Sequence, residues 1–247
     1  MGISFFVVGC TISEYVSLHI CRMNLQEFAS DLVVKARLGT LGSNSFDDLV
    51  HVKFDDLQAQ LPSDQQKMAF WINLYNAKLV QVIRNNNEIQ NVYTTRMIDI
   101  AGLHMSLDDI EHGILRRSKL KATMGYVRKP RVASWEKALR VKRLDPRIHF
   151  ALNCGANSCP PIFNYSPNTL DSTLDRATKN YLLESSVISS CHGEVHAPRL
   201  LLWYLGDFGG FAGIRALYQR HGIVPPDVFP KFKFLNYDWS RNLENFA

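Results

Sequence analysis

The sequence predicts a helix-rich α+β fold, formed by a single domain with a small mixed or antiparallel sheet. Three observations predict it: the long apolar patterns have helical spacing, the alternating patterns are short, and no repeat or linker divides the chain. With 247 residues and 28.2 kDa, a compact chain buries roughly three-quarters of its unfolded surface and needs no disulfide or metal for its core. Its 46% hydrophobic and 21% charged residues exclude disordered, collagen-like and coiled-coil proteins.

Two helices are predicted in the first third of the chain. Residues 24–38 carry apolar side chains at helical spacing, and Gly39 ends the pattern. The second helix begins at Ser63, since Gln66 three residues later completes a capping box. Its apolar side chains cover nearly every side, so we expect a central helix that ends at residues 85–87.

A capping box at Ser106 predicts a short helix that ends near Arg117, with acidic residues at its start and basic residues at its end. Residues 147–153 alternate between apolar and other side chains, which predicts a strand half-buried on one face. Pro167 begins a further helix, residues 168–183. Downstream we expect the strands 194–197 and 232–239 and the helices 200–205 and 214–221.

Basic residues are concentrated between positions 116 and 147. This segment holds twelve Lys and Arg against two acids, a net charge of +10 in a chain of net charge +5. Such a segment binds nucleic acid, an acidic protein or an anionic membrane surface, or it is a solvated face. No aromatic ladder or nucleic-acid motif accompanies it, which favours the solvated face.

The sequence contains no recognisable targeting signal near its amino terminus. No apolar run reaches the ~18 residues of a membrane-spanning helix, so no transmembrane segment is expected. Residues 1–10 are apolar but lack a basic start and are too short for a secretion signal, and Phe6 departs from the myristoylation pattern. We therefore expect a lead-in of residues 1–22, one domain of residues 23–247, and a cytoplasmic location by default.

Two pairs of polar residues lie on predicted helices. Asn73 and Asn76 are three residues apart and so share one helix face, where they either bond loop backbone or line a site. Glu111 and His112 are adjacent, diverge by ~100° and are not expected to orient each other. His112 is either a half-exposed residue or a base that titrates near neutrality.

Residues 145–161 are the most informative segment, since a predicted strand ends there in a Gly/Asn/Ser turn between Cys154 and Cys159. Backbone N–H groups of such a turn hold an anion or form an oxyanion hole beside a thiolate. In a continuous strand His149 would lie roughly 16 Å from Cys154 on the opposite face, so His112 or His196 is the more plausible base. The alternatives are idle thiols, or a redox-active disulfide if the Cα atoms lie within ~7 Å.

A structural zinc site is a weaker alternative. Cys154 and Cys159, with Cys191, His192 and His196, supply five ligands, but only the first pair fits zinc spacing, and that loosely. We therefore predict no metal and no other cofactor.

The motifs at residues 70–77, 106–116, 145–161 and 237–240 together resemble the domain-of-unknown-function family 547, over about residues 60–240. Some relatives follow a glutaredoxin domain and a DEP domain, and plant members often follow a leucine zipper. The family carries no agreed reaction, and the glutaredoxin fusions imply thiol chemistry by analogy only. The resemblance points to Asn73, Asn76, Glu111, His112, His149, Cys154, Ser158 and Cys159.

Two functions are therefore weighed. The first is a thiol-dependent enzyme for a small molecule or peptide, of papain- or transglutaminase-like type or for thiol–disulfide exchange. Its predicted catalytic residues are Cys154, Cys159, His112, His149 and Glu111, and its predicted binding residues are Asn73, Asn76, Asn153, Ser158 and Arg116. The second is a non-catalytic module that binds a protein, lipid or RNA through the basic segment, residues 116–147.

Overall fold

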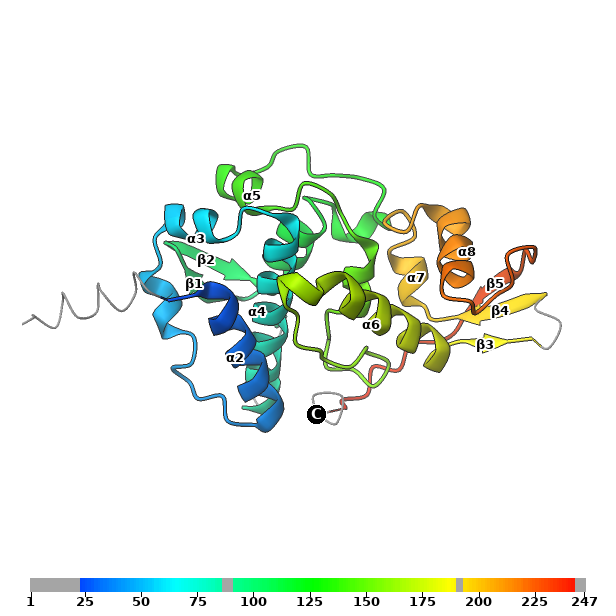
Figure 1. Cartoon of the computed structure of the whole chain (residues 1–247), viewed down its shortest axis with the longest axis horizontal. Coiled ribbons are helices and arrows are strands. Elements are labelled where there is room, and N and C mark those ends of the chain that lie inside the picture. Colours follow the sequence, from blue (N-terminus) through cyan, green and yellow to red (C-terminus); the bar gives the residue numbers. More distant parts are fainter. Residues whose placement is uncertain (1–22, 86–90, 190–192, 243–247) are drawn as a thin grey trace, which may run out of the picture.

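The structure is a computed structural model that describes residues 23–85, 91–189 and 193–242. The predicted lead-in, residues 1–22, lies outside the described residues. The fold is helix-rich α+β, as predicted, with one antiparallel and one mixed sheet, both small. One hydrophobic cluster surrounds the central helix, and a second lies beside the three-stranded sheet. Figure 1 shows this sheet at the opposite end of the molecule from the first helices of the chain. No helix among the described residues is long and apolar enough to cross a membrane.

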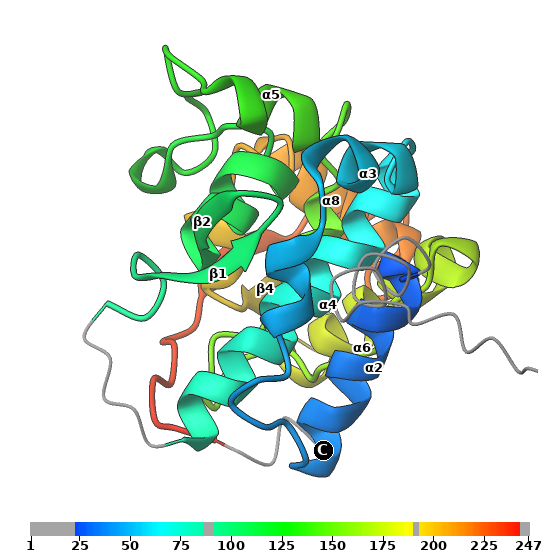
Figure 2. The same cartoon turned by 90° about the vertical axis from the view of Figure 1, so that its left-hand side faces the viewer.

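The central helix is α4 (Asp64–Arg84). Ser63 caps it with the predicted capping box, and nearly every side chain between Lys67 and Val82 is buried. It packs against α2 (Leu25–Leu38), which Asn24 and Gly39 cap. Figure 2 shows α2 and α3 (Phe54–Gln60) covering this helix. A 3₁₀ helix, η1 (Asp47–His51), connects α2 to α3.

A short antiparallel pair follows, which the sequence patterns do not predict. It consists of β1 (Arg96–Ile100) and β2 (Leu103–Ser106). The predicted helix after Ser106 is η2 (Asp109–Leu115), which has π-helical geometry. Asp109 completes the predicted capping interaction, since its carboxylate accepts from the Ser106 backbone N–H at 3.0 Å. The helices η3 (Lys121–Thr123) and α5 (Ser134–Leu139) lie on the loop that follows.

The predicted strand 147–153 is wrong. A 3₁₀ helix, η4 (Pro146–Phe150), begins this segment, and Asp145 caps it by accepting from the Arg147 backbone N–H at 3.0 Å. Pro146 suits the first helical position because its fixed φ is helical and its missing N–H is not needed there. Ile148, His149 and Phe150 are all buried, which an alternating half-buried strand does not allow. The alternation of the sequence therefore had no structural counterpart.

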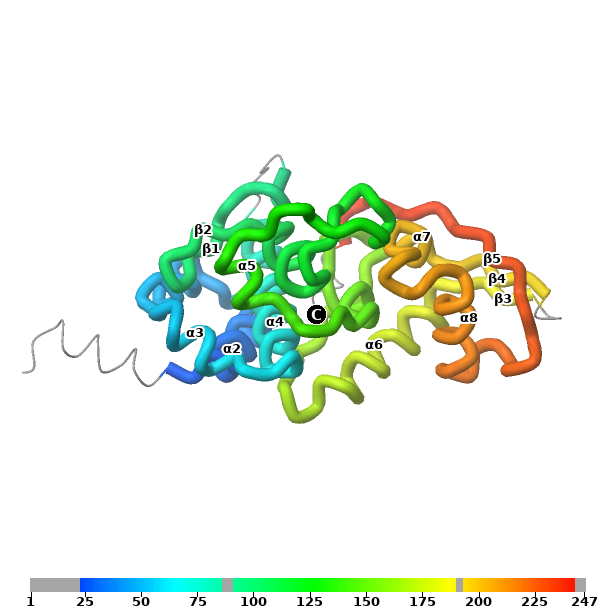
Figure 3. The backbone as a smooth tube through the Cα atoms, turned by 90° about the horizontal axis from the view of Figure 1, so that it is seen from above, coloured from blue at the N-terminus to red at the C-terminus, as the bar shows by residue number. Residues whose placement is uncertain are grey.

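The second half of the fold surrounds the mixed sheet (Figure 3). Its strands are β3 (Val187–Ile188), β4 (Glu194–Ala197) and β5 (Lys231–Phe234), with β4 antiparallel to β3 and parallel to β5. The helices η5 (Pro167–Thr169) and α6 (Leu170–Glu184) precede the sheet. The helices α7 (Leu200–Trp203) and α8 (Gly210–Arg220) lie between β4 and β5.

After β5 the chain returns to the turn between Cys154 and Cys159, which we call the cysteine turn. We call residues 235–242 the C-terminal strap, and Figure 3 shows it running back from the sheet toward the middle of the molecule. The Asn157 N–H donates to the Ser240 carbonyl at 2.7 Å, and the Asp238 N–H donates to Ser158 Oγ at 2.9 Å. Only the first part of the predicted closing strand 232–239 is therefore a strand, within β5. Its remainder belongs to the strap.

Candidate active site

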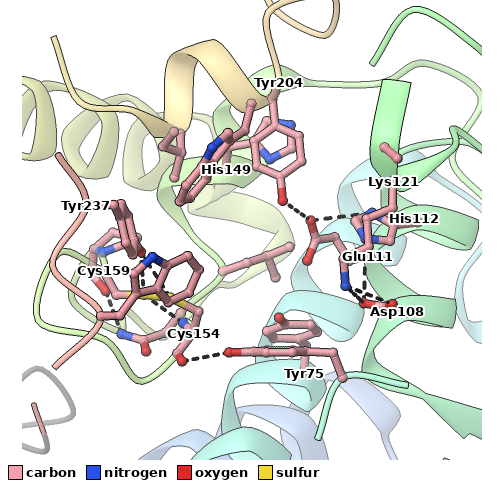
Figure 4. A pocket seen from close by; sticks show the side chains of 18 of the residues that line it. Tyr75, Asp108, Glu111, His112, Lys121, His149, Cys154, Cys159, Tyr204 and Tyr237 are labelled. Atoms are coloured by element: carbon pink, nitrogen blue, oxygen red, sulfur yellow. Dashed lines mark hydrogen bonds and ion pairs between the residues drawn. A yellow bond between two sulfur atoms is a disulfide. The ribbon is translucent and has the colours of Figure 1, made fainter. Parts of the chain in front are cut away.

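A pocket of about 370 Å³ lies where α4, η2, the cysteine turn, α7 and the strap meet (Figure 4). Its walls are largely aromatic and apolar, with a few ionisable groups among them. Such a cavity with convergent polar groups is the usual form of a small-molecule site. Of the predicted site residues it brings together Glu111, His112, His149, Asn153, Cys154 and Cys159.

Cys154 and Cys159 form a disulfide in one wall of the pocket, with their Cα atoms 6.1 Å apart. Cys154 is half-buried and Cys159 is buried. The Cys154 backbone N–H donates to Cys159 Sγ at 2.9 Å. The Tyr237 hydroxyl lies 3.0 Å from Cys154 Sγ and 3.1 Å from Cys159 Sγ. Because a disulfide sulfur carries no hydrogen, the tyrosine is the donor.

His149 also lines the pocket, where it stacks on Tyr204 with ring centroids 3.7 Å apart. Its Nε2 lies 2.9 Å from Oδ2 of Asp207. Burial lowers the pKa of His149, which outweighs the opposing effect of Asp207. Burial alone would raise the pKa of Asp207, but hydrogen bonds from His149 and Arg116 hold that pKa well below its usual value. The ring is therefore neutral, with its proton on Nε2 and Nδ1 as its acceptor.

Arg116 is fully buried behind this wall and is not among the lining residues of the pocket. Its Nε donates to Asp207 Oδ2 at 2.6 Å, and Lys119 Nζ lies 2.8 Å from Asp207 Oδ1. Its Nη1 lies 2.9 Å from Nδ1 of His112. The structure thus places the predicted binding residue Arg116 in a buried ion pair.

Glu111 and His112 both line the pocket, but they do not form a hydrogen-bonded pair. Burial, followed by the charge of Arg116, lowers the pKa of His112 to about 3. Since the neutral ring accepts from Arg116 through Nδ1, its proton is on Nε2, 3.5 Å from Asp108 Oδ1. Nδ1 lies 3.5 Å from Glu111 Oε1 with no proton to donate. Glu111 Oε1 instead accepts from the Tyr204 hydroxyl at 2.7 Å.

The hydrogen bonds described above reach the two sulfurs from the Cys154 N–H and the Tyr237 hydroxyl, and neither donor is a histidine. His196, the other base considered for the thiols, is on β4, where its Nε2 lies 2.5 Å from Glu194 Oε1. It is not among the residues that line the pocket.

The side chains of the predicted amide residues form hydrogen bonds with backbone groups. Asn73 Nδ2 donates to the Tyr165 carbonyl at 2.8 Å, and Asn76 accepts from the Asn153 N–H at 3.0 Å. Asn153 Nδ2 in turn donates to the Pro160 carbonyl at 2.7 Å. Of these amides only Asn153 lines the pocket. Asn76 holds the backbone that leads into the turn between Cys154 and Cys159, whereas Asn73 holds the later loop at Tyr165. The predicted binding residue Ser158 holds the strap through its Oγ.

The zinc alternative falls partly outside the described residues, because Cys191 and His192 are not among them. Within the ranges that the structure describes, no group of three or more His, Cys, Asp or Glu side chains could hold a metal ion.

Much of the basic segment is neutralised within the fold. Five of its twelve basic residues form ion pairs with acids. These five are Arg116, Lys119, Lys121, Lys129 and Arg147. Arg128 and Arg131, by contrast, are exposed. The interaction-module hypothesis keeps only the remaining charges, so the pocket is the stronger basis for a function.

Sequence patterns missed Tyr204 and Asp207, which sit in or beside the Gly-rich segment 206–213. An acid in such a loop was a weak signal, since its partners Arg116 and His149 lie 91 and 58 residues away. Tyr237 belonged to a motif of the resemblance, but nothing in the sequence connected its hydroxyl with the cysteines.

A family model described as "Protein of unknown function, DUF547" matches residues 59–182, half of the chain. Neither the curated proteins nor the solved structures contain a match. The matched range includes Glu111, His149 and the cysteine turn. The residues that complete the pocket from α7 and the strap, among them Tyr204 and Tyr237, follow it.

Proposed function

Given that the chain belongs to the DUF547 family, whose name assigns no reaction, we propose that it is a thiol-dependent enzyme that catalyses thiol–disulfide exchange at Cys154 and Cys159. One observation carries the proposal. A disulfide lines a pocket, and hydrogen-bond donors already contact the sulfur of Cys159, the more buried of the two cysteines. An exchange reaction needs an accessible sulfur and a stabilised leaving thiolate, and this arrangement supplies both.

In the oxidised protein a substrate thiolate attacks Cys154 Sγ. The bond between the two protein sulfurs breaks, a mixed disulfide forms on Cys154, and the electron pair leaves on Cys159. The Cys154 N–H and the Tyr237 hydroxyl donate to that sulfur and so stabilise the thiolate. A second substrate thiolate then attacks the substrate sulfur of the mixed disulfide. Cys154 leaves as a thiolate, and the substrate pair loses the two electrons that the protein gains.

Cys154 is the attacked sulfur in this scheme because it is half-buried whereas Cys159 is 6% exposed. In the reverse direction the Cys154 thiolate attacks a substrate disulfide, and the Cys159 thiolate resolves the mixed disulfide. The direction in use depends on the reduction potential of the substrate relative to the protein.

Trapping of the mixed disulfide tests the proposal. Cys10, Cys21 and Cys191 are first replaced by serine, so that only the pair remains, and Cys159→Ser or Cys154→Ser is then added. With a small aliphatic disulfide, we expect Cys159→Ser to accumulate a mixed disulfide on Cys154, detected by intact-protein mass. Cys154→Ser should react at least tenfold more slowly. Equal, slow reaction of both variants, at the rate of a free cysteine, would refute exchange.

The pair formed by His149 and Asp207 favours a second candidate. Reduced Cys154, His149 as a base and Asp207 as the group that orients it would suit acyl transfer or hydrolysis. Incubation of the reduced protein with an activated acetyl ester distinguishes the two candidates. Acyl transfer predicts an acetyl adduct on Cys154 that turns over and is lost in His149→Gln, whereas exchange alone predicts no turnover.

A further inference from the structure

Glu111 brings a carboxylate into the pocket without a cationic partner. Among the described residues its one ion-pair contact is His112 at 3.5 Å, and that ring is neutral near pH 7. Its Oε1 accepts a hydrogen bond from Tyr204, and no Lys or Arg of the described residues lies within ion-pair distance of it. A carboxylate that is removed from water in this way favours a positively charged partner.

Other acids near the pocket already have such partners. Asp108 pairs with Lys121 at 3.1 Å, and Glu136 pairs with Lys129 at 3.1 Å. Asp207 contacts Arg116, Lys119 and His149. Because Asp108 and Lys121 cancel and both pocket histidines have lowered pKa values, Glu111 gives the lining its net negative charge.

Aromatic rings surround the same cavity, and their faces attract cations. Trp203, Tyr237 and Trp239 form a cluster in which the ring centroids lie 4.6–5.5 Å apart. Tyr75, Tyr93 and Tyr204 line the remaining walls. The charge of Glu111 contributes, after burial, to the raised pKa of Tyr93, about 12. The charge of Glu111 therefore acts on at least one of the aromatic residues that line the cavity.

We propose that the pocket binds the ammonium group of a small aminothiol or of its disulfide, with Glu111 as the counter-ion and the aromatic rings around the cation. Figure 4 shows Glu111 and the disulfide on facing sides of the cavity, and both line the same pocket, so a ligand with an ammonium and a sulfur has a partner for each group there. This inference deepens the exchange function and rests on it for the role of the ligand as substrate. The ammonium site itself does not require that function.

The exchange step with a cationic disulfide such as cystamine is balanced. In the reduced protein the Cys154 thiolate attacks one sulfur of cystamine, and one cysteamine leaves as a thiolate that takes a proton from water. The Cys159 thiolate then attacks Cys154 Sγ of the mixed disulfide and releases the second cysteamine. The protein dithiol is oxidised by two electrons, and cystamine is reduced by two.

Three disulfides of similar size and different charge test the substrate class. They are cystamine, which is cationic, bis(2-hydroxyethyl) disulfide, which is neutral, and 3,3′-dithiodipropionate, which is anionic. Each rate of oxidation of the reduced protein is divided by the rate for the urea-unfolded protein, because the intrinsic reactivities differ. We expect cystamine to react at least tenfold faster than the neutral disulfide and the anionic one to be the slowest.

Glu111→Gln keeps an acceptor for Tyr204 and removes the charge, so it should abolish the preference for cystamine. The matched control is Asp99→Asn, an exposed acid that contacts His104 outside the pocket, and it should keep the preference. Equal normalised rates for the three disulfides would overturn the aminothiol assignment while leaving exchange intact. No reaction with any of them would refute exchange.

Binding without chemistry separates the two proposals completely. The double variant Cys154→Ser/Cys159→Ser cannot exchange, yet propylammonium should still shift the NMR signals of the Trp203 and Trp239 indole N–H groups. n-Butanol and butyrate should not, and Glu111→Gln should lose the response to the cation. An absent response to propylammonium in a folded double variant would refute the ammonium site, whatever the outcome of the exchange assays.

Discussion

Asp207 Oδ2 lies 2.9 Å from Nε2 of His149, although 58 residues separate the two in the chain. The same oxygen accepts from Arg116 at 2.6 Å, and both Asp207 and Arg116 have fully buried side chains. One carboxylate thus fixes the tautomer of a pocket histidine and neutralises a buried guanidinium. Asp207 therefore determines both the stability of this region and the orientation of His149.

Asp207→Asn should lower the free energy of unfolding by about 3–5 kcal/mol, because it leaves Arg116 buried without its counter-charge. Urea denaturation at pH 7 measures this. Asp99→Asn is the matched control, since Asp99 and His104 are both more than half exposed, and it should change stability by no more than about 0.5 kcal/mol. A change below about 1 kcal/mol for Asp207→Asn would show that the buried pair does not make this contribution to the free energy of unfolding.

The lowered pKa of His112 predicts a specific loss of stability in acid. The folded value is about 3 and the unfolded value is about 6.5, so below pH 6.5 the unfolded chain binds a proton that the folded chain excludes. The contribution of neutral His112 to the free energy of unfolding is fully present above pH 6.5. It falls by up to about 1.4 kcal/mol per pH unit as the pH decreases toward 3. Arg116 opposes protonation of the ring and Asp108 favours it.

Comparison with His112→Asn isolates this proton, since the rest of the chain is the same in both proteins. Asn offers Oδ1 in the place of Nδ1 and so keeps an acceptor for Arg116. Urea denaturation of both proteins between pH 4 and pH 7 should give slopes against pH that differ by nearly one proton. Parallel curves would mean that the folded protein admits the proton.

Local signals in the sequence were sufficient for the parts of the fold that depend on neighbouring residues. The capping box at Ser63 predicts the start of α4 because both of its bonds lie within three residues. The segment 145–153 shows the limit. Its alternation suggested a strand, but the local cap of Asp145 and the ring of Pro146 determined a 3₁₀ helix.

The candidate site could be predicted only as a set of separate residues. Cys154, Glu111 and His149 were identified from their chemistry and from the family resemblance. Their grouping around one cavity depends on contacts such as that of Tyr204 with Glu111, 93 residues apart. No local pattern encodes such a contact, so Tyr204 and Asp207 became visible only in the structure.

Tyr237→Phe removes a donor that lies within 3.1 Å of both sulfurs. In the reduced protein we expect the thiolates to lose that hydrogen bond, so that the apparent pKa of Cys154 or Cys159 rises and iodoacetamide labelling at pH 7 slows roughly tenfold. Peptide mass spectrometry of labelling against pH measures both quantities. Tyr126→Phe, at an exposed tyrosine, is the matched control and should leave the labelling profile unchanged.

Asn76→Asp replaces the amide that fixes the cysteine turn. The Asp keeps an acceptor for the Asn153 N–H but faces the Ala151 carbonyl with oxygen instead of a donor. A buried group without its partner costs about 1–3 kcal/mol, and more when it is charged. We expect a loss of at least about 2 kcal/mol in urea denaturation, whereas Gln65→Glu at an exposed position of α4 should have little effect. Equal stabilities of the two variants would contradict a holding role for Asn76.

Gly125→Ala tests whether the loop before α5 must press closely against Asp207. Gly125 has a φ of +84°, and a Cβ at this position would overlap the carboxylate of Asp207. Gly102→Ala is a matched control, because Gly102 has a φ of +75° but nothing within 4 Å of its Cβ position. The control should lower the free energy of unfolding by only about 1–2 kcal/mol, because Ala is unfavourable in a left-handed backbone conformation.

Gly125→Ala in addition displaces Asp207 from Lys119 and Arg116. In urea denaturation, its free energy of unfolding should therefore fall by at least about 2 kcal/mol more than that of Gly102→Ala. Equal losses would mean that the loop moves away without disturbing Asp207, and His149 would then keep its orientation.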